Sequence, residues 1–282
     1  MIKTFLESKY GKYVTDRLIS ADGKVIIENI DKDGLEQQEQ VISHITGLRD
    51  KEGKKLIPDN FLINKVEWGV DFSSWLGSWG TKKKYMFIGA EPHIGNNYQL
   101  VYDFGCFNDK SIEESAKIHY GRESDIWYYL TRIFVDDLTN SNITDFLSKC
   151  YITDLSHMVP KQCGQVKDIS KKLNITEKEW SVFRSKVAQT FIPDEIKAVN
   201  PEYVILHGNA SRNYFRDVLN LKYTESYSIT DSPYKILVGQ FNGYKVVSIP
   251  HLKGDMRNKL WKCKKYPGRP ISAKSILTQI IN

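Results

Sequence analysis

Short apolar runs that end in glycine or a polar residue recur along the chain from residue 85 onward. They cover Tyr85–Gly89, Cys150–Leu155, Tyr203–His207, Tyr234–Val238 and Tyr244–Ile249. Runs of this kind are typical of buried strands, and Asn242-Gly243 supplies a turn between the last two. Helices are predicted at Leu35–Leu48, Ser124–Val135, Ile175–Phe191 and Asn209–Leu219. Strands that alternate with helices predict an α/β fold whose mainly parallel sheet is covered on both faces.

Local signals refine this outline. Thr176 and Glu179 have the spacing of a capping box, which predicts a helix start there. The segment Trp68–Gly80 holds three tryptophans among Gly and Ser and predicts an irregular connection. The stretch from Asp255 predicts a helix interrupted at Pro267–Pro270. We therefore divide the chain into an N-terminal extension of unknown role (1–80) and an α/β domain with a basic C-terminal segment (81–282).

The net charge of +6 is concentrated at one end of the chain. Residues 251–282 carry 8 basic side chains and one acidic side chain, net +7, whereas residues 1–80 and 81–250 are close to neutral. A concentrated basic segment matches a polyanion such as nucleic acid, although it can equally be a solvated helix face. No run reaches the roughly 18 apolar residues of a membrane helix. The start of the chain has no apolar signal region, and the four cysteines form no C-x-x-C pair, so we expect a cytoplasmic, reduced protein without a membrane partner.

The polar residues that follow the strands are the candidates for chemistry, because ligands of parallel sheets bind at the carboxyl ends of the strands. These endings are Gly89-Ala90-Glu91-Pro92-His93, Asp154, His207-Gly208-Asn209-Ala210 and Ser248-Ile249-Pro250-His251. Two carboxylates and a histidine on one rim can supply an acid, a base and electrostatic stabilisation.

The order and spacing of these segments, over about residues 82–265, resemble the uracil-DNA glycosylase superfamily. The resemblance implies a three-layer α/β/α sandwich with a short, mainly parallel central sheet. Its first motif matches Gly89-Ala90-Glu91-Pro92-His93 and implies that Glu91 holds the attacking water. Phe104, fifteen residues past Gly89, would stack on the flipped base, and Thr153-Asp154 takes the place of the motif that contacts the base edge.

The last motif of that superfamily supplies a histidine that stabilises the departing base. His251 is its counterpart here, although it follows Pro250, whereas in the family motif the histidine precedes the proline. The resemblance therefore implies a monofunctional DNA glycosylase that flips and excises a pyrimidine, with Glu91 and His251 as catalytic residues. Gly89, Ala90, Pro92 and His93 would shape the base pocket together with Phe104 and Asp154.

Asp154 differs from the asparagine of uracil-excising relatives and points to another base. An ionised carboxylate only accepts hydrogen bonds, which suits the exocyclic amino group of cytosine but not uracil O4. We expect a modified cytosine, because excision of the ordinary base would be toxic. In this respect the superfamily is similar to bacterial anti-phage glycosylases that remove glucosylated hydroxymethylcytosine, so an antiviral defence role is implied.

The basic C-terminal segment is predicted to bind the DNA backbone. Lys253, Arg257, Lys259 and Lys262 follow His251 directly and would contact phosphates, which position DNA without reading its sequence. No Walker or Rossmann glycine motif supports a nucleotide cofactor, and no standard ligand spacing supports a metal, so neither is expected.

Three alternatives stay open at this point: a uracil-specific repair glycosylase, an inactive DNA-binding module of the same fold, and a small-molecule α/β enzyme that acts on free nucleosides. The exact base, the preference for single- or double-stranded DNA and the oligomeric state are not readable from the sequence.

Overall fold

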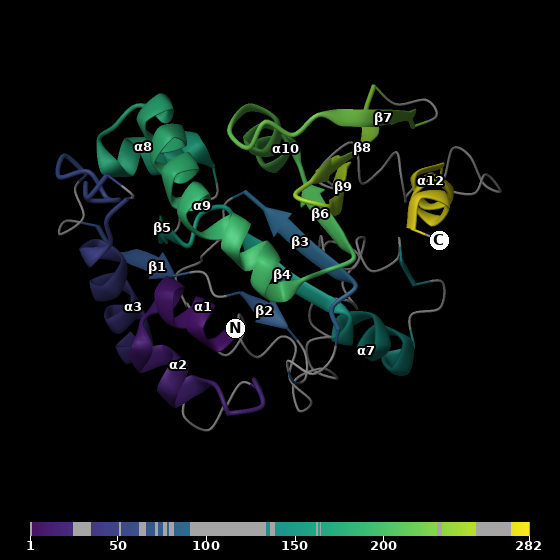
Figure 1. Cartoon of the computed structure of the whole chain (residues 1–282). Coiled ribbons are helices and arrows are strands. Elements are labelled where there is room, and N and C mark those ends of the chain that lie inside the picture. The colour runs from purple at the N-terminus through teal and green to yellow at the C-terminus, as the bar shows by residue number, and fades with distance from the viewer. Residues whose placement is uncertain are drawn as a thin grey trace.

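The structure is a computed structural model of the whole chain (Figure 1). It describes residues 2–24, 35–50, 52–61, 66–70, 73–75, 78, 82–90, 134–135, 139–161, 163, 165–229, 233–251 and 272–281. The helices are α1 (Ile2–Tyr10), α2 (Lys12–Leu18), α3 (Leu35–Gly47), α7 (Asn140–Ser148), α8 (Val166–Leu173), α9 (Glu177–Val199), α10 (Asn209–Asp217) and α12 (Ser272–Ile281). The strands are β1 (Trp68–Val70), β2 (Ser74–Trp75), β3 (Tyr85–Gly89), β4 (Cys150–Asp154), β5 (Met158–Pro160), β6 (Tyr203–His207), β7 (Tyr223–Ser228), β8 (Lys235–Phe241) and β9 (Tyr244–Ile249).

The described part of the chain is mixed α/β, built on a seven-stranded sheet with the order β2-β4-β3-β6-β9-β8-β7. The four central strands, β4, β3, β6 and β9, are mutually parallel. The outer strands β2, β8 and β7 run antiparallel to their neighbours. The prediction of a mainly parallel central sheet is thereby confirmed for the strands that end at the candidate residues. β1 and β5 pair antiparallel in a separate two-stranded sheet.

Successive side chains of a strand point to opposite faces of the sheet, and helices cover both faces. On β3, Met86 and Ile88 belong to a core shared with α1, α3, α9 and α10, which we call the first core. Tyr85 and Phe87 belong to a second core, formed with α7 and α12. In Figure 1, α9 crosses the sheet over β4 and β3, whereas α7 and α12 lie away from α9.

The described part of residues 1–80 shares the first core with the sheet. Leu6 and Tyr10 of α1 are buried in that core, and α1 packs against α9. The irregular connection predicted at Trp68–Gly80 is wrong in part, because β1 and β2 form there. Trp75 of β2 stacks on Tyr151 at 6.0 Å and donates a hydrogen bond to the Gly23 carbonyl at 2.9 Å. The N-terminal segment is thus tied to the sheet by packing and by a strand.

Local signals in the sequence set several boundaries correctly. The capping box is confirmed: the Thr176 hydroxyl accepts from the Glu179 N–H, and the Glu179 carboxylate accepts from the Thr176 N–H. α9 runs to Val199, past the predicted end at Phe191, and stops at Asn200, which adopts the left-handed conformation (φ 51°). None of the helices in the described part of the chain is long and apolar enough to span a membrane.

Candidate active site

The carboxyl ends of the four parallel strands meet at one edge of the sheet, as the sequence predicted. In the ladders, Gly89 of β3 lies beside Asp154 of β4, and Ile88 lies beside Leu206 of β6. His207, one residue further along β6, pairs with Ile249 of β9. Four segments far apart in sequence therefore place Gly89, Asp154, His207 and the start of the His251 segment at the same level of the sheet.

Gly89, Asp154 and His207 also share a face of the sheet. Thr153 and Leu206, their neighbours in the chain, point to the face of the first core. Because side chains alternate along a strand, Asp154 and His207 point to the opposite face, that of the second core. At this edge the sheet thus presents a carboxylate, a bare glycine backbone and an imidazole on three adjacent strands.

Gly89 leaves room for the carboxylate of its neighbour. A Cβ on Gly89 would lie 1.9 Å from Asp154 Oδ1 and 3.1 Å from Asp154 Cγ. Real Cβ atoms essentially never come that close to another heavy atom. The Asp154 side chain therefore lies directly over the Gly89 backbone, and any side chain at position 89 would force the carboxylate to move.

Backbone hydrogen bonds extend the β3–β4 pairing past the strand ends. The Leu155 N–H donates to the Gly89 carbonyl at 3.2 Å, and the Ser156 N–H donates to the Ala90 carbonyl at 3.2 Å. These two bonds fix the backbone up to Ala90, the residue that directly precedes Glu91 in the chain.

His207 and His251 form a stacked pair. Their ring centroids are 4.5 Å apart and the rings are inclined by 22°. Burial and, to a smaller extent, the positive charge that His251 can carry together lower the pKa of His207 to about 3. His251 itself is exposed. The sequence places His207 among the polar strand endings, but no role was predicted for it.

Gly208 shapes the other side of His251. Its φ of +94° is in the region that favours glycine, and a Cβ there would lie 3.3 Å from His251 Cδ2. The Gly208 N–H donates to the Ile249 carbonyl at 3.0 Å, so the β6–α10 turn is held against the end of β9. His251 is therefore packed against the His207 ring and the Gly208 backbone.

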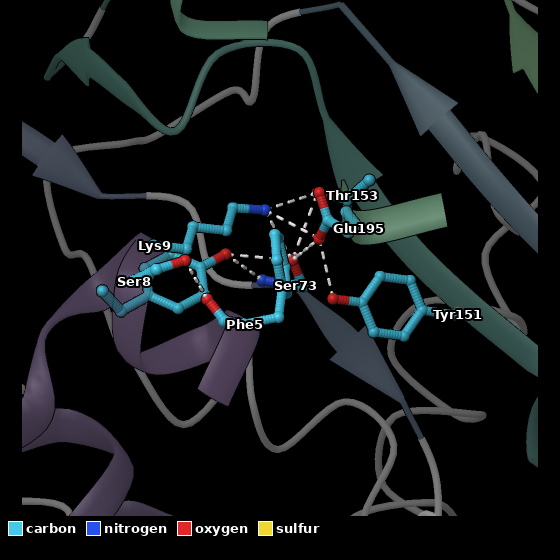
Figure 2. A network of polar contacts seen from close by, with 8 residues as sticks. Phe5, Ser8, Lys9, Ser73, Tyr151, Thr153 and Glu195 are labelled. Atoms are coloured by element: carbon cyan, nitrogen blue, oxygen red, sulfur yellow. Dashed lines mark hydrogen bonds and ion pairs between the residues drawn. The ribbon is translucent and has the colours of Figure 1, made fainter. Parts of the chain in front are cut away.

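On the opposite face, a buried polar network supports the end of β4 (Figure 2). The Lys9 ammonium donates to Ser73 Oγ at 2.9 Å, Thr153 Oγ1 at 3.0 Å and Glu195 Oε1 at 2.8 Å. Tyr151 donates to the same carboxylate oxygen at 2.7 Å, and both charged side chains have zero exposure. No sequence pattern indicates this network, because Lys9 and Glu195 are 186 residues apart. Its enclosure makes it a structural element rather than a ligand site.

Several predicted site residues lie outside the residues that the structure describes. They are the predicted catalytic residue Glu91, Pro92, His93 and Phe104 of the base pocket, and Lys253, Arg257, Lys259 and Lys262 of the backbone-binding segment. The described members of the predicted site, Gly89, Ala90, Asp154 and His251, follow strands that end at the same edge of the sheet.

Comparison of the chain with protein-family models and with curated proteins finds no match. Within the described residues, no group of three or more His, Cys, Asp or Glu side chains could hold a metal ion. The edge itself presents a carboxylate, which accepts hydrogen bonds, and an exposed imidazole, which can donate them.

Proposed function

We propose that the chain is a monofunctional DNA glycosylase that excises a pyrimidine base, with a modified cytosine as its target. The observation that supports this most is the meeting of Asp154, Gly89 and His251 at the carboxyl edge of the parallel strands. A side chain that contacts the base edge and a group that stabilises the departing base must face one nucleotide from the same edge of the sheet. The edge provides one of each, and Glu91 follows Ala90 directly.

In the proposed reaction the target nucleotide is flipped out of the stack, and water replaces the base at the sugar. The bond between C1′ and the base nitrogen breaks through an oxocarbenium-like state, the water oxygen bonds to C1′, and Glu91 takes the released proton. The base leaves as an anion that accepts a hydrogen bond from His251 and is then protonated. No redox partner or cofactor is needed for this balance.

Asp154 assigns the base class in this proposal. Its carboxylate lies over the Gly89 backbone at the rim, where it accepts from an exocyclic amino group such as cytosine N4. A 5-substituted cytosine keeps that amino group, so hydroxymethylcytosine and its glucosylated form are the substrates to test first.

The test is base release from defined duplexes. Purified protein is incubated with DNA that contains uracil, cytosine, 5-hydroxymethylcytosine or glucosylated 5-hydroxymethylcytosine, and abasic sites are counted after alkaline cleavage. We expect release from a modified-cytosine duplex, and Glu91→Gln should slow it by roughly 10²–10⁴-fold, the usual contribution of a general base.

Glu202→Gln is the matched control, because Glu202 is exposed, pairs with Lys82 at 2.9 Å and precedes β6 at the opposite edge of the sheet. Release of uracil alone would refute the assignment of the base. Wild-type protein that binds DNA but releases no base would identify an inactive binding module, and activity on free nucleosides without affinity for DNA would identify a small-molecule enzyme.

A further inference from the structure

His207 and His251 are distant in the sequence and are brought together by the pairing of β6 with β9. His207 ends β6, whereas His251 lies two residues beyond the end of β9, which pairs parallel to β6. The stacked geometry, 4.5 Å between centroids at 22°, places one imidazole face on the other. Gly208, at φ +94°, keeps the space on the adjoining side clear of a side chain.

The stack also restricts charge. His207 is uncharged at neutral pH, because burial and the neighbouring His251 charge both lower its pKa, to about 3. Any positive charge of the pair is therefore carried by His251, the exposed member. Among the described residues, Asp154 of β4 lies against Gly89, and the guanidinium of Arg212 of α10 donates to Asn209. Further along these elements, Arg216 pairs with Asp217 near the end of α10, and Lys245 lies near the start of β9 and donates to the Ile280 carbonyl.

We propose that His207 is a positioning residue for His251: its half-buried ring forms a platform that fixes the plane in which the His251 ring presents its nitrogens. This rests on the proposed function, in which His251 donates a hydrogen bond to the departing base. Hydrogen bonds prefer donor angles above about 150° and weaken steeply below about 120°, so an exposed histidine needs its ring plane fixed to act as a reliable donor. A stack holds the ring by its face and leaves the nitrogens at its edge outside the contact.

Two substitutions separate the flat shape of the His207 ring from its ability to take up a proton. Phenylalanine at position 207 keeps a flat ring and is uncharged, whereas alanine removes the platform. His207→Ala should lower kcat for base release by roughly 10–100-fold, the scale expected when a catalytic group is misplaced, with KM for DNA within about twofold. His207→Phe should retain kcat within about threefold of wild type.

The second readout does not depend on activity. The ring protons of His251, assigned by their loss in His251→Ala, are followed by NMR in wild type and in both His207 variants. The ring-current shift caused by the stack should be retained in His207→Phe and lost in His207→Ala. Unchanged His251 resonances in His207→Ala, or kcat equal to wild type in that variant, would overturn the positioning role.

The outcomes also distinguish this inference from the proposed function. If wild-type protein releases no base from any duplex, the proposed function fails and the catalytic role of the stack fails with it, while NMR still reports whether the rings stack. If His207→Ala and His207→Phe lose kcat equally although the stack persists in the latter, the platform is refuted while the glycosylase assignment stands.

Discussion

Replacing Lys9 with methionine should destabilise the protein more than any exposed charge substitution. Lys9 uses all three ammonium hydrogens in hydrogen bonds, to Ser73, Thr153 and Glu195, and its side chain has no exposure to water. Methionine fills similar space but supplies no donor. The Glu195 carboxylate would then remain buried with two hydroxyl donors, Tyr151 and Ser73, and without a counter-ion.

The magnitude follows from the burial of the pair. Removing one partner of a buried ion pair costs about 3–5 kcal/mol, because it leaves an uncompensated buried charge. Replacing both charges with uncharged side chains of similar volume is often close to neutral. The double variant Lys9→Met/Glu195→Gln should therefore be less destabilised than the sum of the two single variants.

Urea unfolding followed by fluorescence and far-UV circular dichroism measures the free energy of unfolding of all three variants and of wild type. Lys3→Met is the control in the same helix, because Lys3 pairs with Asp16 at 3.3 Å with both side chains about half exposed. Exposed pairs contribute about 0–1 kcal/mol. A Lys9→Met cost no larger than that of Lys3→Met, or strict additivity in the double variant, would refute the buried network as a source of stability.

Three further predictions concern the edge of the sheet and the predicted DNA path. Gly89→Ala should destabilise the protein and reduce base release by displacing Asp154. Gly47→Ala is the control and should do neither, because Gly47 is at the end of α3 and nothing lies within 4 Å of a Cβ there. Unfolding and base-release assays on both variants test this. Stability should fall as pH drops from about 6.5 toward 5, because the unfolded chain protonates His157 and His207 while burial holds both native pKa values lower. Each histidine contributes up to about 1.4 kcal/mol per pH unit to the slope of the free energy of unfolding against pH, and His207→Phe should remove the contribution of one of them. A free energy of unfolding that does not change over this pH range would contradict the pKa directions. Neutralising Lys259, Lys262 and Lys264 together should reduce the slope of log K for DNA binding against log salt concentration by up to about 3. Neutralising the exposed Lys167, Lys171 and Lys178 is the control and should leave the slope unchanged. Equal slopes in the two variants would mean that the C-terminal segment does not contact phosphates.

The strands of the central sheet were predictable because each is a short apolar run with a polar end. Tyr85–Gly89, Tyr203–His207 and Tyr244–Ile249 have the bounds that the pattern predicted. Such strands are buried on both faces, so their composition alone distinguishes them from their surroundings. β2 was missed for the opposite reason: it has two residues, and its place in the sheet comes from pairing with β4.

The short helices α7 and α8 were not predicted, whereas the long helix α9 was. α9 has a capping box and an extended apolar pattern, whereas α7 and α8 bury only a few residues each, such as Ile143 in α7 and Ile169 in α8. Helices of nine and eight residues are marginal on their own, and packing stabilises them, α7 against β4 and α8 against α9 and β5.

The residues of the candidate site could be predicted from the sequence, whereas the contacts between them could not. The sequence identifies which residues end the strands, and hence that Asp154 and His251 lie at one edge. It does not show that Asp154 lies over Gly89 or that His207 stacks on His251, because both contacts depend on the register between strands that are distant in the sequence.

Consecutive residues at the end of β4 have opposite tasks, and the alternation of the strand explains how. Thr153 points to the first core, where it accepts from Lys9 at 3.0 Å, while Asp154 points to the other face and lies against Gly89. The end of β4 is therefore held from one face by a buried ion-pair network and from the other by a close contact with a glycine. A loss of the Lys9 network would loosen the strand at the residue next to Asp154, so the N-terminal helix contributes to the geometry of the edge although it supplies no group to it.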